Sequence, residues 1–339
     1  MRSIKLGRTD IDSSIMGFGC MGMSEFYGGH NDEESLKTLE RALELGVTHF
    51  DTSNVYGRGR NEELVGRFIA GKRERIMLST KFGIVRDPDG PDGSTYDRAI
   101  DNSPEYMRRC CEESLKRLGT DHIDLYLVHR TDPRVPIEQT ASALGDLVKA
   151  GKIRGYGLSE VTAEQLRAAH AVHPVAALQS EYSLWTREAE AGVLPACAEL
   201  GITFVAYSPL GRGFLTGAVQ KTTLAQDDFR LTSPRFQGEN FDRNQALVDQ
   251  VRAFADEKHC TPGQIALAWL FHRGQDIVPI PGTKRIKYLE ENVGAVNVSL
   301  SESDLATIDR IMPPGVAAGT RYDAKFAGAP QAPTQGARA

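Results

Sequence analysis

Short apolar runs alternate with amphipathic segments along most of this chain, and this alternation limits the folds that it can adopt. The runs are rich in β-branched and aromatic residues, which predicts buried strands. They lie at residues 15–19, 47–50, 76–80, 123–128, 153–158, 177–178, 202–206 and 277–280. The segments between them carry apolar residues at helical spacing, as at Leu64, Phe68 and Ile69. We therefore predict a (β/α)8 TIM barrel, in one domain over residues 1–339.

A doubly wound α/β sheet is the alternative architecture for this pattern. The GxGxxG at residues 17–22 overlaps the first predicted strand, so the sequence lacks the dinucleotide fingerprint, which follows that strand and has an acidic residue downstream. Residues 1–12 predict an N-terminal β-hairpin. We predict long loops at residues 87–93 and 211–241 and place them at the carboxyl face of the barrel. We also predict an irregular extension at residues 314–339.

Composition narrows the possible partners. The 40 Lys and Arg against 45 Asp and Glu give a formal charge of −5, so neither nucleic acid nor an anionic membrane is expected. No apolar run approaches the roughly 18 residues of a membrane span, and the N-terminus lacks an apolar signal core. Five cysteines, with Cys110 and Cys111 adjacent, do not match a disulfide framework, which indicates a reducing cytoplasm. The sequence has no metal-ligand spacing and leaves the oligomeric state open.

Polar side chains stand at, or just beyond, the carboxyl ends of most predicted strands. They are Asp51, Tyr56, Lys81, His129, Ser159, Gln179 and Tyr207. In a β/α barrel the loops that follow the strands converge on this face and build the active site there. Each residue alone also fits a turn or a helix cap, but together they predict an active site.

The types of these groups suggest a proton-transfer site. A phenol is a poor acid at neutral pH unless a cation stabilises its phenolate, and Lys81 is a candidate cation for Tyr56. Asp51 is a candidate ion-pair partner for Lys81, and His129 is a candidate donor to a carbonyl oxygen. Such a phenol suits carbonyl reduction, in which a nicotinamide or flavin must supply hydride because no side chain can. The alternatives are a structural ion pair, a solvated loop at His129 and a simple turn at Tyr56.

Several ordered motifs match a known family. The stretch from Asp51 to Gly57 matches the motif Asp-(four residues)-Tyr-Gly, and Lys81 and His129 complete a tetrad. The other matching segments are residues 17–23 (GFGCMGM), 128–130 (VHR), 207–213 (YSPLGRG) and 280–283 (IPGT). The chain thus resembles the aldo-keto reductase superfamily along nearly its whole length. It is similar in particular to the branch of perakine and pyridoxal reductases and auxin-induced-protein-like reductases.

This resemblance implies NADPH-dependent reduction of aldehydes or ketones to alcohols. Tyr56 would donate the proton, Lys81 and Asp51 would tune it, and His129 would orient the carbonyl of a small-molecule substrate. The residues implied in binding NADP(H) are Cys20, Met21, Ser159, Gln179, Tyr207, Ser208, Leu210, Arg212, Gly282, Lys284, Glu291 and Asn292. Of these, Ser159, Gln179 and Tyr207 would hold the nicotinamide, residues 208–212 the pyrophosphate and residues 282–292 the adenosine end.

The chain departs from the family pattern at two positions. Glu160 replaces the Asn or Arg that many members carry, so we assign it no contact with the nicotinamide carboxamide. Tyr288 stands where other branches place Arg or Gln near the 2′-phosphate. Lys284 and Arg285, at the start of a predicted helix, favour NADPH over NADH, and Arg235 is a second candidate cation.

The substrate preference is less readable. Four aromatic residues lie on loops of the expected face: Phe26, Tyr27, Trp185 and Phe236. They could form an apolar wall for the substrate, or each could pack the loop against the barrel. Cys110 and Cys111 fit the core better than a reactive role.

Two rival functions are compatible with the residues. One is a cofactor-loaded sensor or regulatory subunit, as in the related potassium-channel β subunits, where Asn replaces the tetrad histidine; His129 favours turnover. The other is a Schiff-base enzyme with Lys81 as nucleophile, which borohydride would trap without any nicotinamide.

Overall fold

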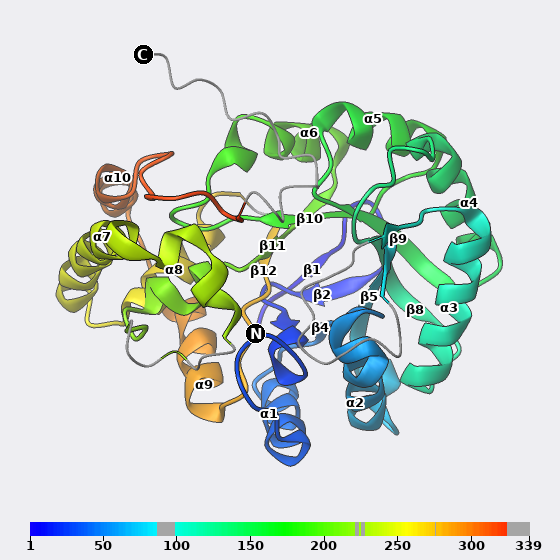
Figure 1. The fold of residues 1–339 in the computed structure, drawn as a ribbon, viewed down its shortest axis with the longest axis horizontal. Helices are drawn as coiled ribbons and strands as arrows, with labels where there is room; N and C mark the ends of the chain where they lie inside the picture. The colour runs from blue at the N-terminus through cyan, green and yellow to red at the C-terminus, as the bar shows by residue number, and fades with distance from the viewer. Residues whose placement is uncertain (87–98, 221–223, 225–227, 275, 324–339) are drawn as a thin grey trace.

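Within residues 1–86, 99–220, 224, 228–274 and 276–323, which the computed structural model describes, eight strands form one parallel sheet (Figure 1). They are β3 (Phe18–Gly19), β4 (His49–Asp51), β5 (Met77–Phe82), β8 (Ile123–Val128), β9 (Ile153–Ser159), β10 (Ala177–Glu181), β11 (Thr203–Tyr207) and β12 (Ile277–Pro279). Their order in the sheet is their order along the chain. This arrangement confirms the predicted (β/α)8 barrel.

Backbone hydrogen bonds join the first strand to the last and close the sheet. Gly17 N donates to Pro279 O (2.9 Å), and Gly19 N donates to Pro281 O (3.2 Å). The backbones approach so closely that a Cβ on Gly19 would lie 2.9 Å from a carbonyl oxygen of the opposite segment. Glycine at this position therefore permits the barrel to close.

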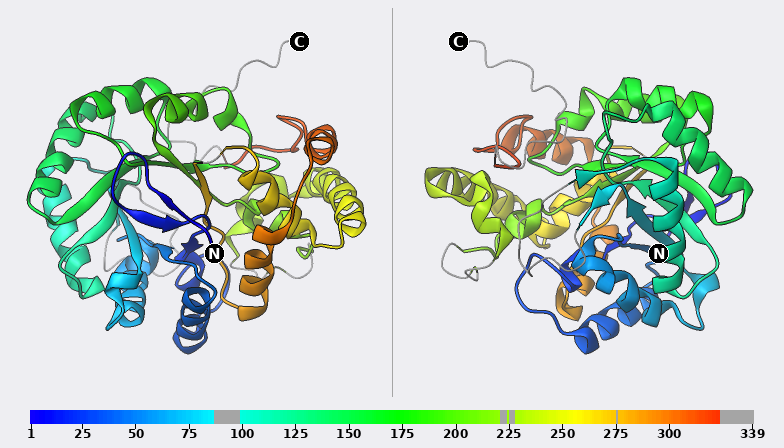
Figure 2. Two further views of the ribbon diagram at one scale, coloured as in Figure 1. Left: turned by 180° about the vertical axis from the view of Figure 1, so that it is seen from behind. Right: turned by 45° about the vertical axis from the view of Figure 1, so that its right-hand side comes forward.

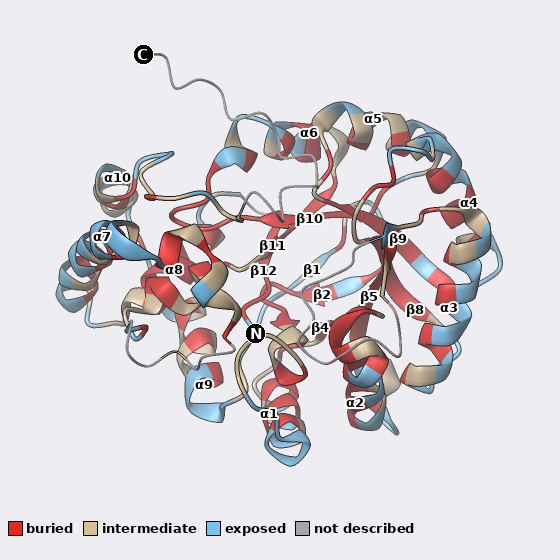
Figure 3. Cartoon of the chain, in the orientation of Figure 1, coloured by how far each residue is buried: buried red, intermediate tan, exposed pale blue. Residues whose placement is uncertain are grey.

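Helices surround the sheet and turn their buried faces towards it (Figure 3). They are α1 (Asp32–Glu44), α2 (Arg60–Ile69), α3 (Pro104–Leu118), α4 (Ile137–Lys149), α5 (Ala163–Val172), α6 (Val193–Leu200), α7 (Gly238–Glu257), α8 (Pro262–Phe271), α9 (Ile286–Gly294) and α10 (Glu302–Ile311). Capping boxes at Thr162 and Thr261 satisfy the first amides of α5 and α8. Cys110 and Cys111 are residues of α3 that face the core, and all five cysteines are free thiols. No helix among the described residues is long and apolar enough to cross a membrane.

A hairpin closes the amino-terminal end of the barrel (Figure 2, left). β1 (Ser3–Lys5) pairs antiparallel with β2 (Asp12–Ser14), so the hairpin extends two residues beyond the predicted 1–12. Leu6 and Ile11, between these strands, are fully buried against inner barrel side chains such as Leu125. The hairpin thus acts as an apolar plug for the end that lies opposite the predicted site.

Loops and the C-terminal tail gather at the carboxyl end of the sheet. The segment after β11 forms short 3-10 helices, η5 (Gly211–Thr216), η6 (Phe229–Thr232) and η7 (Pro234–Phe236). Residues 314–323 contain no helix or strand, as predicted, yet they pack back on the barrel. The predicted loop 87–93 and residues 324–339 lie outside the described residues.

Candidate active site

A cavity of about 810 Å³ opens at the carboxyl end of the sheet. This is the size range of pockets for small molecules and cofactors. The predicted residues that line it are Met21, Asp51, Tyr56, His129, Ser159, Gln179, Tyr207, Ser208, Leu210, Arg212, Gly282, Lys284, Glu291 and Asn292. Lys81 lies behind this wall, and Cys20 does not line it.

Lys81 connects the buried members of the tetrad. Its Nζ forms an ion pair with Asp51 and donates to Thr52 O (2.8 Å) and to Tyr56 Oη (3.3 Å). The Lys81 side chain is fully buried, and Asp51 is 3% exposed. Because a buried charge is costly without a partner, the pair fixes both side chains behind Tyr56.

A hydrogen-bond chain beneath the tetrad holds Asp51. The parallel register of β4 and β5 sets Asp51 beside Ser79. Asp51 Oδ2 accepts from Ser79 Oγ (2.8 Å) and from Gln179 Nε2 (2.9 Å). His49 Nε2 lies 2.9 Å from Ser79 Oγ, and burial lowers the pKa of His49 to about 4. A neutral imidazole therefore supports the carboxylate at neutral pH.

Tyr56 is a neutral phenol in these surroundings. Burial, followed by the negative charge of Asp51, raises the pKa of Tyr56 well above its ordinary value. This direction of the pKa shift is opposite to the lowering expected from Lys81, because burial, assisted by the Asp51 carboxylate, disfavours the phenolate. Burial also lowers the pKa of Lys81, with Asp51 acting in the opposite direction. The protonated phenol is the form that a general acid requires.

His129 shares the cavity wall with Tyr56. It follows β8, and its Nδ1 lies 3.2 Å from Ser53 Oγ. The two rings are nearly perpendicular, at 88°, with centroids 5.8 Å apart. A ligand oxygen against Tyr56 would therefore also lie close to the imidazole.

The ends of β9, β10 and β11 bring a hydroxyl, a carboxamide and an aromatic ring to the cavity. Ser159 Oγ accepts a long hydrogen bond from Arg130 Nη1 (3.4 Å). Gln179 uses its Nε2 on Asp51, which leaves its Oε1 as an acceptor towards the cavity. Tyr207 brings a ring to the same wall. These groups match a flat carboxamide-bearing ring such as nicotinamide.

Arg212 brings a buried guanidinium to the cavity. Its Nη1 is buried and donates to no acceptor among the described residues. The guanidinium lies over the rings of Phe229 (5.2 Å) and Tyr322 (4.8 Å). Its backbone is left-handed, with φ 58°, which non-glycine residues adopt mainly where surrounding structure enforces it. An anionic group such as a pyrophosphate would satisfy this buried donor.

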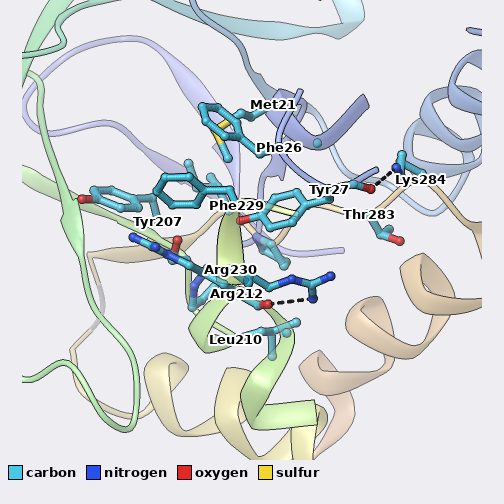
Figure 4. Close-up of a pocket in the computed structure, with 18 of the residues that line it drawn as sticks. Met21, Phe26, Tyr27, Tyr207, Leu210, Arg212, Phe229, Arg230, Thr283 and Lys284 are labelled. Atoms are coloured by element: carbon cyan, nitrogen blue, oxygen red, sulfur yellow. Dashed lines mark hydrogen bonds between the residues drawn. The ribbon is translucent and has the colours of Figure 1, made fainter. Parts of the chain in front are cut away.

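At the far end of the cavity, the Lys284 ammonium is hydrogen-bonded to backbone carbonyl oxygens of the same chain. Its Nζ donates to Tyr27 O (2.6 Å) and to Gly29 O (2.8 Å), which ties the loop after β3 to the loop after β12 (Figure 4). Burial lowers the pKa of Lys284. Its neighbour Arg285 is exposed at the start of α9 and is the better-placed cation for a phosphate.

Three predicted positions lie away from the cavity. Cys20 is fully buried in the core, because the chain turns into a 3-10 helix at Met21, and Met21 faces the cavity instead. Trp185 and Phe236 pack against each other and are buried, whereas Phe26 and Tyr27 line the cavity.

Arg235 is also buried and is not among the residues that line the cavity. It donates to Thr186 Oγ1 (2.6 Å), lies over the Trp185 ring (5.0 Å) and is 3.8 Å from Glu181. The prediction that it serves as a second cation for the cofactor is therefore wrong.

The tail contributes two residues that the sequence reasoning missed. Tyr322 lines the cavity, and Arg321 forms ion pairs with Glu160 and Glu181. The signal was Glu160 itself, a carboxylate directly after the strand-end Ser159, which needs a cation when buried. Its partner, 161 positions further along the chain, has no local sequence pattern that marks it.

Comparisons with known proteins agree on one family. Residues 15–313 match the model described as the aldo/keto reductase family. A Glycine max protein named "Probable aldo-keto reductase 1" is 44% identical over 327 residues, 95% of this chain and 92% of that protein. A Schizosaccharomyces pombe protein named "Aldo-keto reductase yakc [NADP(+)]" is 45% identical over 324 residues, 94% and 93% of the two chains.

Solved structures give the same result. The glycerol dehydrogenase of Gluconobacter oxydans superposes with a TM-score of 0.83 at 30% identity, covering 91% of this chain and 94% of that one. An aldo-keto reductase of Bacillus halodurans in its holo form gives 0.76 at 26% identity, covering 92% and 96%.

Proposed function

The chain belongs to the aldo/keto reductase family, and from that premise we propose that it reduces aldehydes or ketones to alcohols with NADPH. The observation that carries the proposal is the contact between Tyr56 Oη and Lys81 Nζ (3.3 Å), backed by Asp51 and opening on the wall that His129 shares. This arrangement holds a proton and can stabilise the charge left when the proton leaves.

The residues present fit a nicotinamide dinucleotide. Arg212 offers a buried donor without a partner among the described residues, and Ser159, Gln179 and Tyr207 suit a carboxamide-bearing ring. When bound, the nicotinamide supplies the hydride chemistry that no side chain offers. Arg285 at the start of α9 supports NADPH over NADH, as does the NADP(+) in the name of the Schizosaccharomyces pombe relative.

The protein's own part in the reaction is to orient the carbonyl and to deliver a proton. Tyr56 keeps its proton at Oη because burial and Asp51 disfavour the phenolate. As negative charge develops on the carbonyl oxygen, Tyr56 donates that proton, and the Lys81 ammonium stabilises the phenolate that forms. His129 orients the same oxygen.

The two rival functions have weaker support. Lys81 has three acceptors, is fully buried and does not line the cavity, which does not favour a Schiff-base nucleophile. No feature of the described residues favours a sensor over an enzyme, and the position of His129 on the cavity wall supports turnover.

We place the protein in the branch of perakine and pyridoxal reductases, as a single-domain cytoplasmic enzyme that acts on a small carbonyl compound. The motifs at residues 17–23 and 207–213 support the branch, and five free thiols support a reducing compartment. A net charge of −5 gives no reason to expect nucleic acid or an anionic membrane as partner.

An assay with NADPH and 4-nitrobenzaldehyde tests this function. We expect the absorbance of reduced nicotinamide to fall only when both compounds and the protein are present. If no carbonyl in a panel of aromatic and aliphatic aldehydes is reduced, and NADPH does not bind in calorimetry, the proposal is wrong.

A further inference from the structure

The C-terminal tail crosses the mouth of the barrel. Figure 1 shows the segment after α10, coloured red, running back towards the carboxyl ends of β10 and β11. Ala318 and Asn244 of α7 exchange two hydrogen bonds, of 2.8 and 2.9 Å. Gly319 has φ 87°, and a Cβ there would lie 2.9 Å from Pro234 C, so the tail turns at a position that requires glycine. The tail is thus built into the fold up to the cavity.

Arg321 is the electrostatic anchor of this segment. Its Nη2 donates to both oxygens of Glu160 (3.2 and 3.1 Å), and its Nε donates to Glu181 Oε2 (3.1 Å). Burial alone would raise the pKa of Glu181, but Arg321, Arg212 and Arg235 lower it to about 2. Without Arg321, two neighbouring carboxylates would share a buried site, which is costly.

The backbone conformation of Glu160 and a second hydrogen bond hold its carboxylate in place for the contact with Arg321. Glu160 follows β9 directly, in the left-handed conformation with φ 54°, and its Oε1 also accepts from Glu181 N (2.9 Å). A non-glycine residue in this region costs free energy, which the bonds to Arg321 and to the Glu181 amide offset. The departure from the family pattern at Glu160 is therefore matched by a cation from the tail.

The anchored tail also touches two residues of the proposed cofactor site. Arg321 Nη2 donates to Tyr207 Oη (3.1 Å), and Tyr322 Oη lies 3.2 Å from the same phenol oxygen. The Tyr322 ring lies against the Arg212 guanidinium (4.8 Å). One dipeptide therefore fixes both the aromatic ring at the nicotinamide end and the cation expected at the pyrophosphate.

We propose that Arg321 and Tyr322 are positioning residues of the NADPH site that orient Tyr207 by bonding to its phenol oxygen, while the Tyr322 ring also lies on Arg212. The family match ends at residue 313, so these two residues lie beyond the segment that the family model covers. The ligand class is the nicotinamide half of a reduced dinucleotide, and the inference rests on the proposed function.

The test compares NADPH with 2′,5′-ADP, which carries the adenosine half but lacks nicotinamide. Dissociation constants are measured by calorimetry for the wild type, Arg321→Met, Arg321→Lys, Tyr322→Phe and the control Arg310→Met. Arg310 is an exposed arginine of α10 near the same end of the chain. Circular dichroism establishes that each variant is folded.

We expect Arg321→Met to weaken NADPH binding at least about tenfold while 2′,5′-ADP binding changes less than about twofold. Arg321→Lys, which keeps a cation for Glu160 and Glu181, should recover most of the affinity, and Arg310→Met should match the wild type. Tyr322→Phe keeps the ring on Arg212 but loses the bond to Tyr207, so we expect a smaller loss.

Equal NADPH affinity in wild type and Arg321→Met would overturn the inference, as would equal losses for both ligands. If Arg321→Met does not fold, the Tyr322→Phe variant tests the inference in its place. Unchanged NADPH affinity in Tyr322→Phe would then overturn the assignment of the tail to the nicotinamide half. A wild type that fails to bind NADPH at all would instead overturn the proposed function, so the two failures are distinguishable.

Discussion

In the proposed reaction Tyr56 must keep its proton until a carbonyl oxygen can take it, and its surroundings favour that state. Burial and the Asp51 carboxylate raise its pKa, while the Lys81 ammonium stands 3.3 Å away to meet the phenolate that forms. In this proposal the Lys81 cation is important after proton transfer rather than before it. This separates the role of Lys81 from the simple lowering of the phenol pKa.

At the scale of single residues, the sequence was enough to predict which side chains at the ends of strands lie together near the cavity. Asp51, Lys81 and Gln179 are placed by the backbone register of a barrel, which an alternating pattern already determines. Cys20 and Lys284 were predicted less well because the direction of a loop side chain depends on local turns and on distant carbonyl oxygens.

His49 gives a residue-scale prediction for pH dependence. Its pKa is lowered from 6.5 to about 4 in the fold, so the unfolded chain takes up a proton first as the pH falls. The stabilising contribution is therefore complete above the unfolded pKa and is lost as the pH falls towards 4. We expect a slope of up to ~1.4 kcal/mol per pH unit in the free energy of unfolding, measured with urea.

The His49→Gln variant should lose this part of the slope. His30→Gln is the matched control, because His30 is exposed and its removal should leave the pH dependence as it is in the wild type. An unchanged slope in His49→Gln would show that another group is responsible.

At the scale of elements, two irregular segments close opposite ends of the barrel. The hairpin β1–β2 plugs the amino-terminal end with Leu6 and Ile11, and the tail covers part of the mouth with Arg321 and Tyr322. The hairpin was predictable from its turn residues, since its pairing is local. The course of the tail was not, because its partners lie in α7, β10 and the loop after β9.

The β1–β2 hairpin allows a prediction in which stability changes and activity does not. Leu6→Ala should lower the free energy of unfolding by about 2–5 kcal/mol, since it empties a fully buried site. Under native conditions the turnover number should stay near that of the wild type, because the cavity lies at the other end of the sheet. Urea unfolding and a carbonyl-reduction assay measure the two quantities.

Ile286→Ala serves as the control, since Ile286 is 38% exposed and its truncation should cost less than about 0.5 kcal/mol. A Leu6→Ala protein as stable as this control would mean that the hairpin is not part of the core.

At the scale of the whole molecule, the barrel gathers groups that lie far apart in the chain around one cavity. The alternation of apolar runs and helices was enough to predict this frame, because eight parallel strands have few ways to bury both faces. The contacts between loops at the mouth were not predictable from such a pattern. They depend on ion pairs such as Arg321 with Glu160, which join positions without any sequence periodicity.

The central claim is that Tyr56 supplies the proton for carbonyl reduction, and Tyr56→Phe tests it most directly. The variant keeps the ring that lies perpendicular to His129 and removes only the phenol oxygen. We predict that its dissociation constant for NADPH stays within about twofold of the wild type. Its turnover number with 4-nitrobenzaldehyde should fall at least about a hundredfold, the scale of losing a general acid. A variant that binds NADPH normally and reduces the aldehyde at the full rate would contradict the account.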